Sequence, residues 1–156
     1  MKYLVFILLI SAIVSCNSDI VYQETLQISD AKWNRNELAK FSFNIEDSLS
    51  SYDLYLMIRH AGNFPYKNLY LFSKTYGPRD VFAKDTAQMI FADDKGNWLG
   101  KGIGDIYDYE FKFKEQIVFP YKGEYQIQLE QAMRDIEVEG VTDIGIKLKK
   151  SILNNE

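Results

Sequence analysis

The sequence has 156 residues, of which 47% are hydrophobic and 15% aromatic, and its formal net charge is −4. This length fits one domain with a sizeable core. The mild acidity, without a basic block, argues against nucleic acid or an anionic membrane surface as the main partner. The composition therefore favours a single globular domain, and we predict no cofactor and no small-molecule substrate for it.

The chain begins with an apolar segment that ends at its only cysteine. Lys2 precedes a run from Tyr3 to Val14 in which Ser11 is the only polar residue, and this is the layout of a secretory signal peptide. At about 1.5 Å per residue, a helix over this segment covers roughly 20 Å, whereas a bilayer core needs roughly 30 Å. The segment is therefore too short to be a transmembrane span.

The letters "IVSC" at 13–16 resemble the bacterial lipobox, in which a signal peptidase cuts before a lipidated cysteine. We therefore predict a cleaved lipoprotein signal peptide at 1–15, a lipidated Cys16 with a short tether at 16–21, and a domain at 22–156. Acyl chains on Cys16 hold a protein on a membrane without a transmembrane helix. The alternatives are an uncleaved anchor, or a cleaved signal peptide with an incidental cysteine.

Eight segments have the pattern of β-strands. Several alternate polar and apolar residues with one apolar face at period two, and others are apolar on both faces. The segments are 22–28, 41–45, 52–58, 68–72, 87–92, 111–114, 125–129 and 144–148. Because no amphipathic helix separates them, they predict an all-β fold, a single antiparallel β-sandwich of about eight strands with jelly-roll or immunoglobulin-like topology.

Turn signals place some of the connections. "DDKGNW" at 93–98 predicts a turn in which Gly96 takes a positive φ, and "YKGEY" at 121–125 predicts a second hairpin. Two irregular stretches are expected, at 73–87 and 100–109. One short helical turn is expected within 131–140.

The residues that carry chemistry form no catalytic or metal-binding signature. His60 lacks a partner cysteine or serine motif. Asp93, Asp94 and Asn97 superficially resemble a calcium loop but lack the alternating ligands and distal glutamate of an EF-hand. "GKGIGD" at 100–105 lacks the Lys-Ser/Thr ending of a phosphate loop. We therefore predict that the protein is not an enzyme; a hydrolase with converging carboxylates is the alternative.

Four residues are candidates for either an interaction or a structural role. Trp33 and Trp98 fit a sandwich core, but an exposed tryptophan platform could also stack on sugar rings or anchor a protein partner. Arg59 and Arg134 each abut an apolar segment, where they could pair with a carboxylate or project outward. The core and the ion pair are the favoured interpretations.

Motifs along almost the whole chain resemble one family. They include "FSFNIEDSLSSYDLYLMIRH" at 41–60, "YKNLYLF" at 66–72, "DDKGNWLGKGIGD" at 93–105, "GEYQIQLEQAMR" at 123–134 and "VTDIGIKLKK" at 141–150, with Trp33 and Asp85. In this order the series is similar to the GldH family of gliding-motility lipoproteins from the Bacteroidetes. The family pattern usually has asparagine after the arginine, where this chain has His60.

The resemblance implies an outer-membrane-associated lipoprotein that serves gliding and is linked to type IX secretion. It implies protein partners in that machinery, no catalytic residue, and Cys16 as the functional position that transfers. Because the residues after Cys16 are only weakly acidic, we expect the periplasmic face of the outer membrane, with exposure on the cell surface as the alternative. The alternative function is a carbohydrate-binding sandwich lipoprotein that uses exposed aromatic residues.

Overall fold

The computed structural model describes residues 19–152, apart from the side chains of residues 81 and 82, so the expected signal peptide and Cys16 lie outside the described residues. Within this part, the chain forms eleven strands and one short 3-10 helix at Ser29–Ala31. The strands are β1 (Ile20–Gln27), β2 (Lys32–Asn34), β3 (Ala39–Ile45), β4 (Ser51–Ala61), β5 (Asn68–Tyr76), β6 (Val81–Ile90), β7 (Lys101–Ile103), β8 (Ile106–Val118), β9 (Gly123–Gln131), β10 (Glu137–Glu139) and β11 (Val141–Lys150). No helix among these residues has the length and apolarity needed to cross a bilayer.

The all-β prediction is confirmed, with eleven strands instead of about eight. The eight long strands correspond to the eight predicted segments. The three additional strands, β2, β7 and β10, have three residues each. A segment of three residues is too short to show alternation, so only its pairing partner defines it as a strand.

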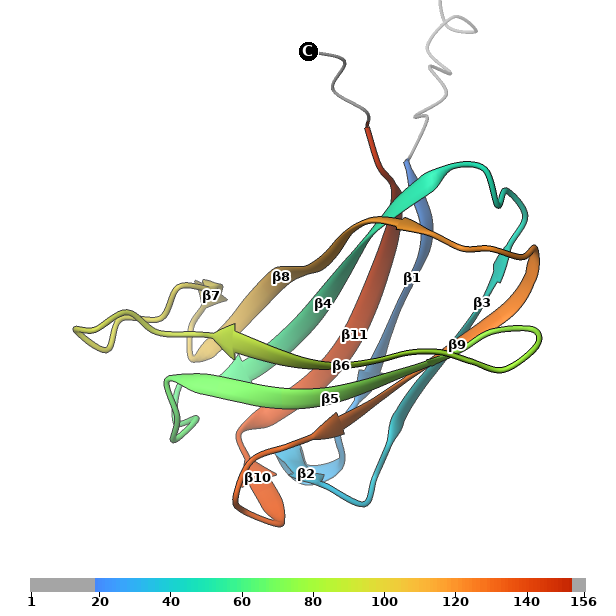
Figure 1. Ribbon diagram of the computed structural model, residues 1–156. Coiled ribbons are helices and arrows are strands. Elements are labelled where there is room, and N and C mark those ends of the chain that lie inside the picture. Colours follow the sequence, from blue (N-terminus) through green and yellow to red (C-terminus); the bar gives the residue numbers. More distant parts are fainter. Residues whose placement is uncertain (1–18, 153–156) are drawn as a thin grey trace, which may run out of the picture.

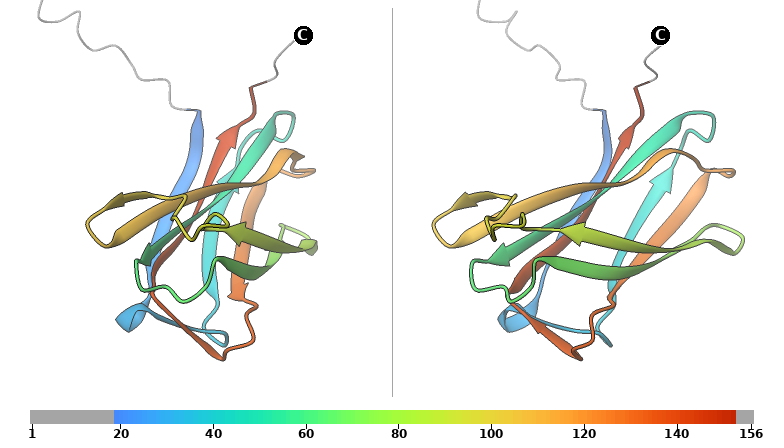
Figure 2. Two further views of the ribbon diagram at one scale, coloured as in Figure 1. Left: turned by 90° about the vertical axis from the view of Figure 1, so that its left-hand side faces the viewer. Right: turned by 60° about the vertical axis from the view of Figure 1, so that its left-hand side comes forward.

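The strand order is that of a jelly roll. The five-stranded sheet has the order β1-β11-β4-β8-β7, the four-stranded sheet has the order β3-β9-β5-β6, and β10 and β2 form a separate ribbon. Counting only the long strands, the first, eighth, third and sixth form one sheet and the second, seventh, fourth and fifth form the other. This order decides between the two predicted topologies in favour of the jelly roll. Figures 1 and 2 show the two sheets as layers, with β5 and β6 crossing in front of β4 and β11.

The core lies between the two large sheets. Strand β3 buries every second residue from Ala39 to Ile45, and β4 buries every second residue from Tyr52 to His60. Facing side chains such as Leu71 are fully buried. Each large apolar side chain that is buried in this way contributes about 1.5 to 3 kcal/mol, so alternation on both sheets defines which face is inside.

Two segments predicted to be irregular are ordered strands. The structure pairs β5 with β6 over most of 73–87 and places only residues 77–80 in the turn. Ser73 and Thr75 are buried on the core face. Because these inward-facing residues are polar, the sequence shows no alternation of polar and apolar residues there. The stretch 100–109 likewise contains β7 and the first residues of β8.

Two predicted connections are different in the structure. The segment 121–125 is not a hairpin, because β8 and β9 belong to opposite sheets and the chain crosses between them. Residues 131–140 contain β10, paired with β2, where a helical turn was expected. The turn at 93–98 is confirmed, since Gly96 has φ +84° and Ala92 pairs with Trp98 across it.

Candidate functional site

The outer face of the five-stranded sheet carries a groove with a volume of about 750 Å³. Strands β1, β4, β8 and β11 and the segment 99–101 line it. Polar side chains, among them Gln23, Thr25 and Arg59, line it together with the apolar Met57 and Leu99. We treat this groove as the candidate functional site.

The groove follows from the register of the four strands. Outward-facing residues form rows across β1, β11, β4 and β8, because directly paired residues on one face lie side by side. The rows are Gln23, Lys147, Tyr55 and Lys112; Thr25, Gly145, Met57 and Glu110; and Gln27, Asp143, Arg59 and Asp108. All four residues of the third row line the groove, together with Thr25, Met57 and Glu110 of the middle row and Gln23 of the first row.

Gly145 belongs to the middle row and has close neighbours where a side chain would lie. A Cβ at this position would lie 2.6 Å from the carbonyl oxygen of Glu24 and 2.7 Å from Oγ1 of Thr25. A contact this short with a backbone atom can be relieved only by moving the strand. The absence of a side chain at Gly145 therefore allows β1 and Met57 to pack closely against β11 at this position.

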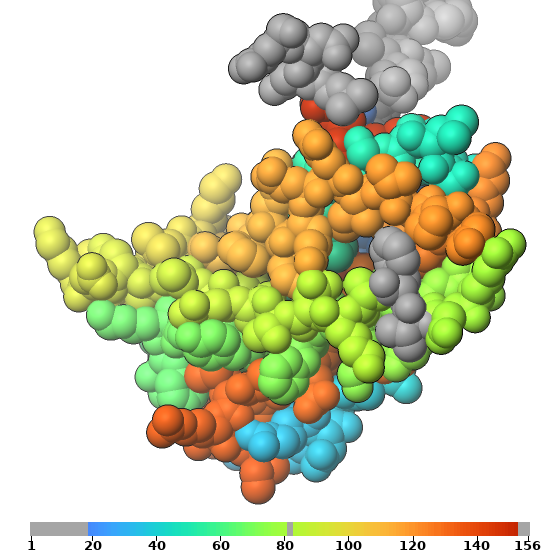
Figure 3. Space-filling view, in the orientation of Figure 1, coloured from blue at the N-terminus to red at the C-terminus, as the bar shows by residue number. Residues whose placement is uncertain are grey.

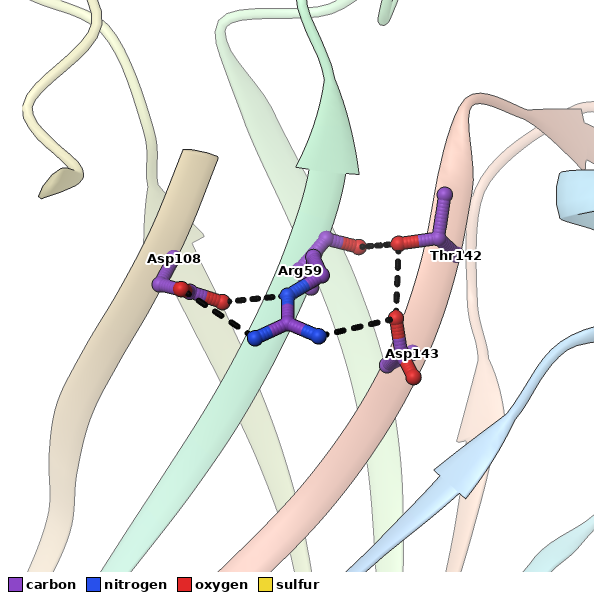
Figure 4. A network of polar contacts seen from close by, with 4 residues as sticks. All are labelled: Arg59, Asp108, Thr142 and Asp143. Carbon is purple, nitrogen blue, oxygen red and sulfur yellow. Dashed lines mark hydrogen bonds and ion pairs between the residues drawn. The ribbon is translucent and has the colours of Figure 1, made fainter. Parts of the chain in front are cut away.

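Arg59 joins two carboxylates at one side of the groove, as Figure 4 shows. Its Nε donates to Oδ1 of Asp108 at 2.7 Å and its Nη2 donates to Oδ2 of the same residue at 3.3 Å, while Nη1 lies 3.9 Å from Oδ2 of Asp143. The hydrogen bond and charge of Asp108 raise the pKa of Arg59 further. The arginine therefore holds three adjacent strands together on their outer face.

A β-bulge at Thr142 places Asp143 beside Arg59. Val141 pairs with His60 and Asp143 pairs with Arg59, so Thr142 is the extra residue. In a regular strand Val141 and Asp143 would share a face, but the bulge leaves Val141 in the core and turns Asp143 outward. The hydroxyl of Thr142 donates to the carbonyl of Arg59 at 3.2 Å or to Oδ2 of Asp143 at 2.8 Å, which fixes the bulge.

The three carboxylates that line the groove are each paired with a cation. Asp108 and Asp143 contact Arg59, and Glu110 contacts Lys147. Neither here nor elsewhere in residues 19–152 is a group of three or more His, Cys, Asp or Glu side chains placed to hold a metal ion. The charges in the groove are thus largely balanced by ion pairs within the protein.

The structure places the two tryptophans away from the groove. Trp33 is fully buried, and its Nε1 donates to the carbonyl of Glu37 at 2.9 Å. Trp98 is half-buried, with its ring centroid 4.6 Å from that of His60. The tryptophans belong to different clusters and do not form a common exposed platform.

His60 lies inside an aromatic cluster, where it has no exposed surface. The rings of Phe64, Phe91, Trp98 and Tyr107 surround it at centroid distances of 4.6 to 5.5 Å. Its Nδ1 lies 3.0 Å from the carbonyl oxygen of Ala61, whereas its buried Nε2 has no hydrogen-bond partner. Burial lowers the pKa of this imidazole, and its position inside the fold makes it part of the core.

Of the two candidate arginines, only Arg59 lines the groove. Arg134 is exposed in the β9–β10 connection, where its carbonyl accepts a hydrogen bond from Arg35 at 3.0 Å. Sequence reasoning missed the partners Asp108 and Asp143, because their contact with Arg59 depends on the strand order. The only sequence signal for these two residues was that they are polar residues near the ends of strands.

The fold and the groove define a class: a jelly-roll domain with a polar groove on one outer sheet face. The family model of the GldH lipoprotein matches residues 20–148, and the chain belongs to this family. A gliding motility lipoprotein GldH homolog of Christiangramia forsetii is 33% identical over 154 residues, covering 94% of both chains. The gliding motility lipoprotein GldH of Flavobacterium johnsoniae is 30% identical over 153 residues, covering 92% of this chain and 94% of the relative.

Solved structures of infectious bursal disease virus are similar at a low level. The Gx strain structure has a TM-score of 0.32 and 13% identity, covering 89% of this chain and 32% of the viral chain. The VP2 subviral particle has a TM-score of 0.31 and 16% identity, covering 82% and 29%. The matched part spans about a third of the length of each viral chain.

Proposed function

We propose that this gliding-motility lipoprotein is a non-catalytic accessory protein of the gliding and type IX secretion machinery. Residues 1–15 are removed as a signal peptide, and acyl chains on Cys16 anchor the domain to the periplasmic face of the outer membrane. The similarity over nearly the whole chain to two gliding motility lipoproteins carries this proposal.

The geometry of the groove supports binding more than catalysis. Glycoside hydrolysis needs two carboxyl groups that face each other across the substrate. Asp108 and Asp143 instead lie on either side of Arg59 and both contact its guanidinium. We propose that the groove is a contact surface for a partner of the machinery, with Arg59 bracing the strands that form it.

The alternative of a sugar-stacking tryptophan platform has little support in the structure. Trp33 is buried, and Trp98 packs on His60. A stacking platform needs exposed aromatic faces, so this pair does not supply one.

The test uses the organism that carries the protein. A deletion strain and a strain with Cys16→Ala are compared for membrane fractionation, colony spreading and secretion of type IX cargo. We expect the deletion to abolish spreading or secretion, and the Cys16→Ala protein to be soluble and unable to restore them. Normal spreading and secretion in both strains would contradict the proposal.

A separate pair of variants tests the groove in the same strains. Thr25→Trp fills the middle row from an exposed position on β1, and Ser42→Trp places the same side chain on the outer face of the four-stranded sheet. We expect Thr25→Trp to impair spreading at normal protein level, and Ser42→Trp to leave it unchanged. Equal spreading of both strains would rule out the groove as the contact surface.

A further inference from the structure

Large apolar side chains gather at the end of the sandwich where the described chain begins and ends. We call this surface the apolar rim, and its residues with their exposed fractions are Ile20 (40%), Leu49 (93%), Val118 (54%), Tyr121 (41%) and Ile152 (74%). They come from β1, the β3–β4 connection, β8, the β8–β9 connection and the residues after β11. Figure 3 shows the β3–β4 connection and the end of β8 together at the top of the molecule.

Backbone hydrogen bonds join the strand ends that carry the rim. The amide of Lys150 donates to the carbonyl of Asp19 at 2.9 Å, and the amide of Ser151 donates to that of Ser51 at 2.9 Å. Ser51 in turn pairs with Val118. The ends of β1, β11, β4 and β8 thus form one continuous edge that carries Ile20 and Val118. Leu49 lies two residues before β4, Ile152 two residues after β11, and Tyr121 three residues after β8.

Leu49 projects from a turn whose backbone is fixed. The carboxylate of Asp47 accepts from the amides of Leu49 and Ser50 at 3.0 and 3.2 Å, from the Ser50 hydroxyl at 2.6 Å and from Nζ of Lys150 at 3.0 Å. These hydrogen bonds, led by that of Ser50, hold the pKa of Asp47 well below its usual range. The turn therefore presents Leu49 to the surroundings instead of folding it onto the core.

Tyr121 adds an aromatic ring beside cations. The guanidinium carbon of Arg79 lies 3.9 Å from the centroid of its ring, and Lys122 follows it in the chain. Aliphatic side chains combined with tyrosine, arginine and lysine are the composition that settles at the interface of a bilayer.

We infer that the apolar rim rests on the surface of the membrane to which the protein is anchored. This rests on the proposed lipidation of Cys16, which is three residues before Asp19 and so at most about 11 Å from it. An anchor this short keeps the rim at the bilayer, where the local concentration makes weak apolar contacts sufficient. The domain then has one orientation, and the far row of the groove lies about 24 Å along β1 from Ile20.

The test compares two equally exposed residues that lie at opposite ends of the strands of the five-stranded sheet. Leu49 on the rim and Ile103 in the β7–β8 hairpin are both 93% exposed. In the lipidated full-length protein the sulfur of Cys16 is bound in a thioether, so Leu49→Cys or Ile103→Cys supplies the one thiol for a nitrobenzoxadiazole label. The labelled proteins are placed on dioleoylphosphatidylcholine vesicles with or without brominated acyl chains.

We expect bromine to lower the emission at position 49 by about twofold or more, because interfacial groups lie about 5 to 10 Å deep, and to leave position 103 unchanged. Val118→Asp in the Leu49→Cys protein should weaken the quenching. Equal emission at both positions in protein that floats with the vesicles overturns the rim contact alone. If the emission at position 49 changes with the amount of protein per vesicle and not with bromine, the labelled residue contacts a second copy of the protein. This result also overturns the contact of the rim with the membrane. Protein that does not float overturns the anchor, and the rim contact with it.

Discussion

Gly145 and Met57 face each other across β11 and β4, and the terminal methyl carbon of Met57 lies 2.9 Å from the place a Cβ on residue 145 would occupy. The methionine could move, but the carbonyl oxygen of Glu24, at 2.6 Å from that place, belongs to the backbone of β1. The close packing of β1 and β4 against β11 therefore depends on the lack of a side chain at residue 145.

The first prediction follows from this contact. Gly145→Ala should lower the free energy of unfolding by about 1 to 3 kcal/mol, since the added methyl forces β1 away from β11. Urea denaturation of the purified protein measures the change. Lys40→Ala, at an exposed position of β3, is the control and should change stability by less than about 0.5 kcal/mol. A neutral Gly145→Ala would show that β1 is not tightly packed there.

The second prediction concerns the arginine that joins three strands. Arg59→Ala should lower the free energy of unfolding by about 1 kcal/mol, because the pair with Asp108 is half-exposed and solvent screens it. Arg134→Ala, which removes the other candidate arginine from an exposed connection, should have an effect within about 0.5 kcal/mol. Equal effects of the two substitutions in urea denaturation would contradict the bracing role of Arg59.

The third prediction concerns pH. Burial lowers the pKa of His60 in the folded protein, so between this value and the unfolded pKa the unfolded state binds more protons. Stability is therefore complete above the unfolded pKa of about 6.5 and is lost as the pH falls below it. His60→Phe fits the aromatic cluster and removes the titration. Its melting temperature should fall less between about pH 7.5 and pH 5 than that of the wild type, and parallel falls would exclude His60 as the cause.

The fourth prediction separates the two tryptophans. Trp33→Ala should cost about 3 to 5 kcal/mol, because the indole is fully buried and its N–H is hydrogen bonded. Trp98→Ala should cost about 1 to 2 kcal/mol, since this ring is only half-buried. Chemical denaturation of both variants gives the comparison. A larger loss for Trp98→Ala would mean that the His60 cluster, and not the Trp33 site, dominates the core.

Periodicity in the sequence was enough to predict the eight long strands, because apolar residues alternate clearly in segments such as 41–45 and 125–129. It failed at 73–76, where Ser73 and Thr75 occupy core positions, and at the three-residue strands. The choice of jelly roll also needed the structure, since alternation within a strand carries no information about its neighbours.

The groove could be predicted only in part. Arg59 was a candidate from its position at a strand end, but its partners Asp108 and Asp143 are far from it in the sequence. The bulge at Thr142 decides which way Asp143 faces, and no local pattern marks it. The sequence therefore predicted Arg59 as a candidate residue, but its partners in the site depend on strand pairing over long sequence distances.

The direction of β1 has a mechanical consequence. This strand follows the proposed anchor directly and pairs antiparallel with β11 from Ile20 to Gln27, while its outward side chains form one wall of the groove. A pull between the anchor and a ligand in the groove would act along the strands. The hydrogen bonds of the β1–β11 pair are perpendicular to that direction, so they would share the load in shear and would not open one after another.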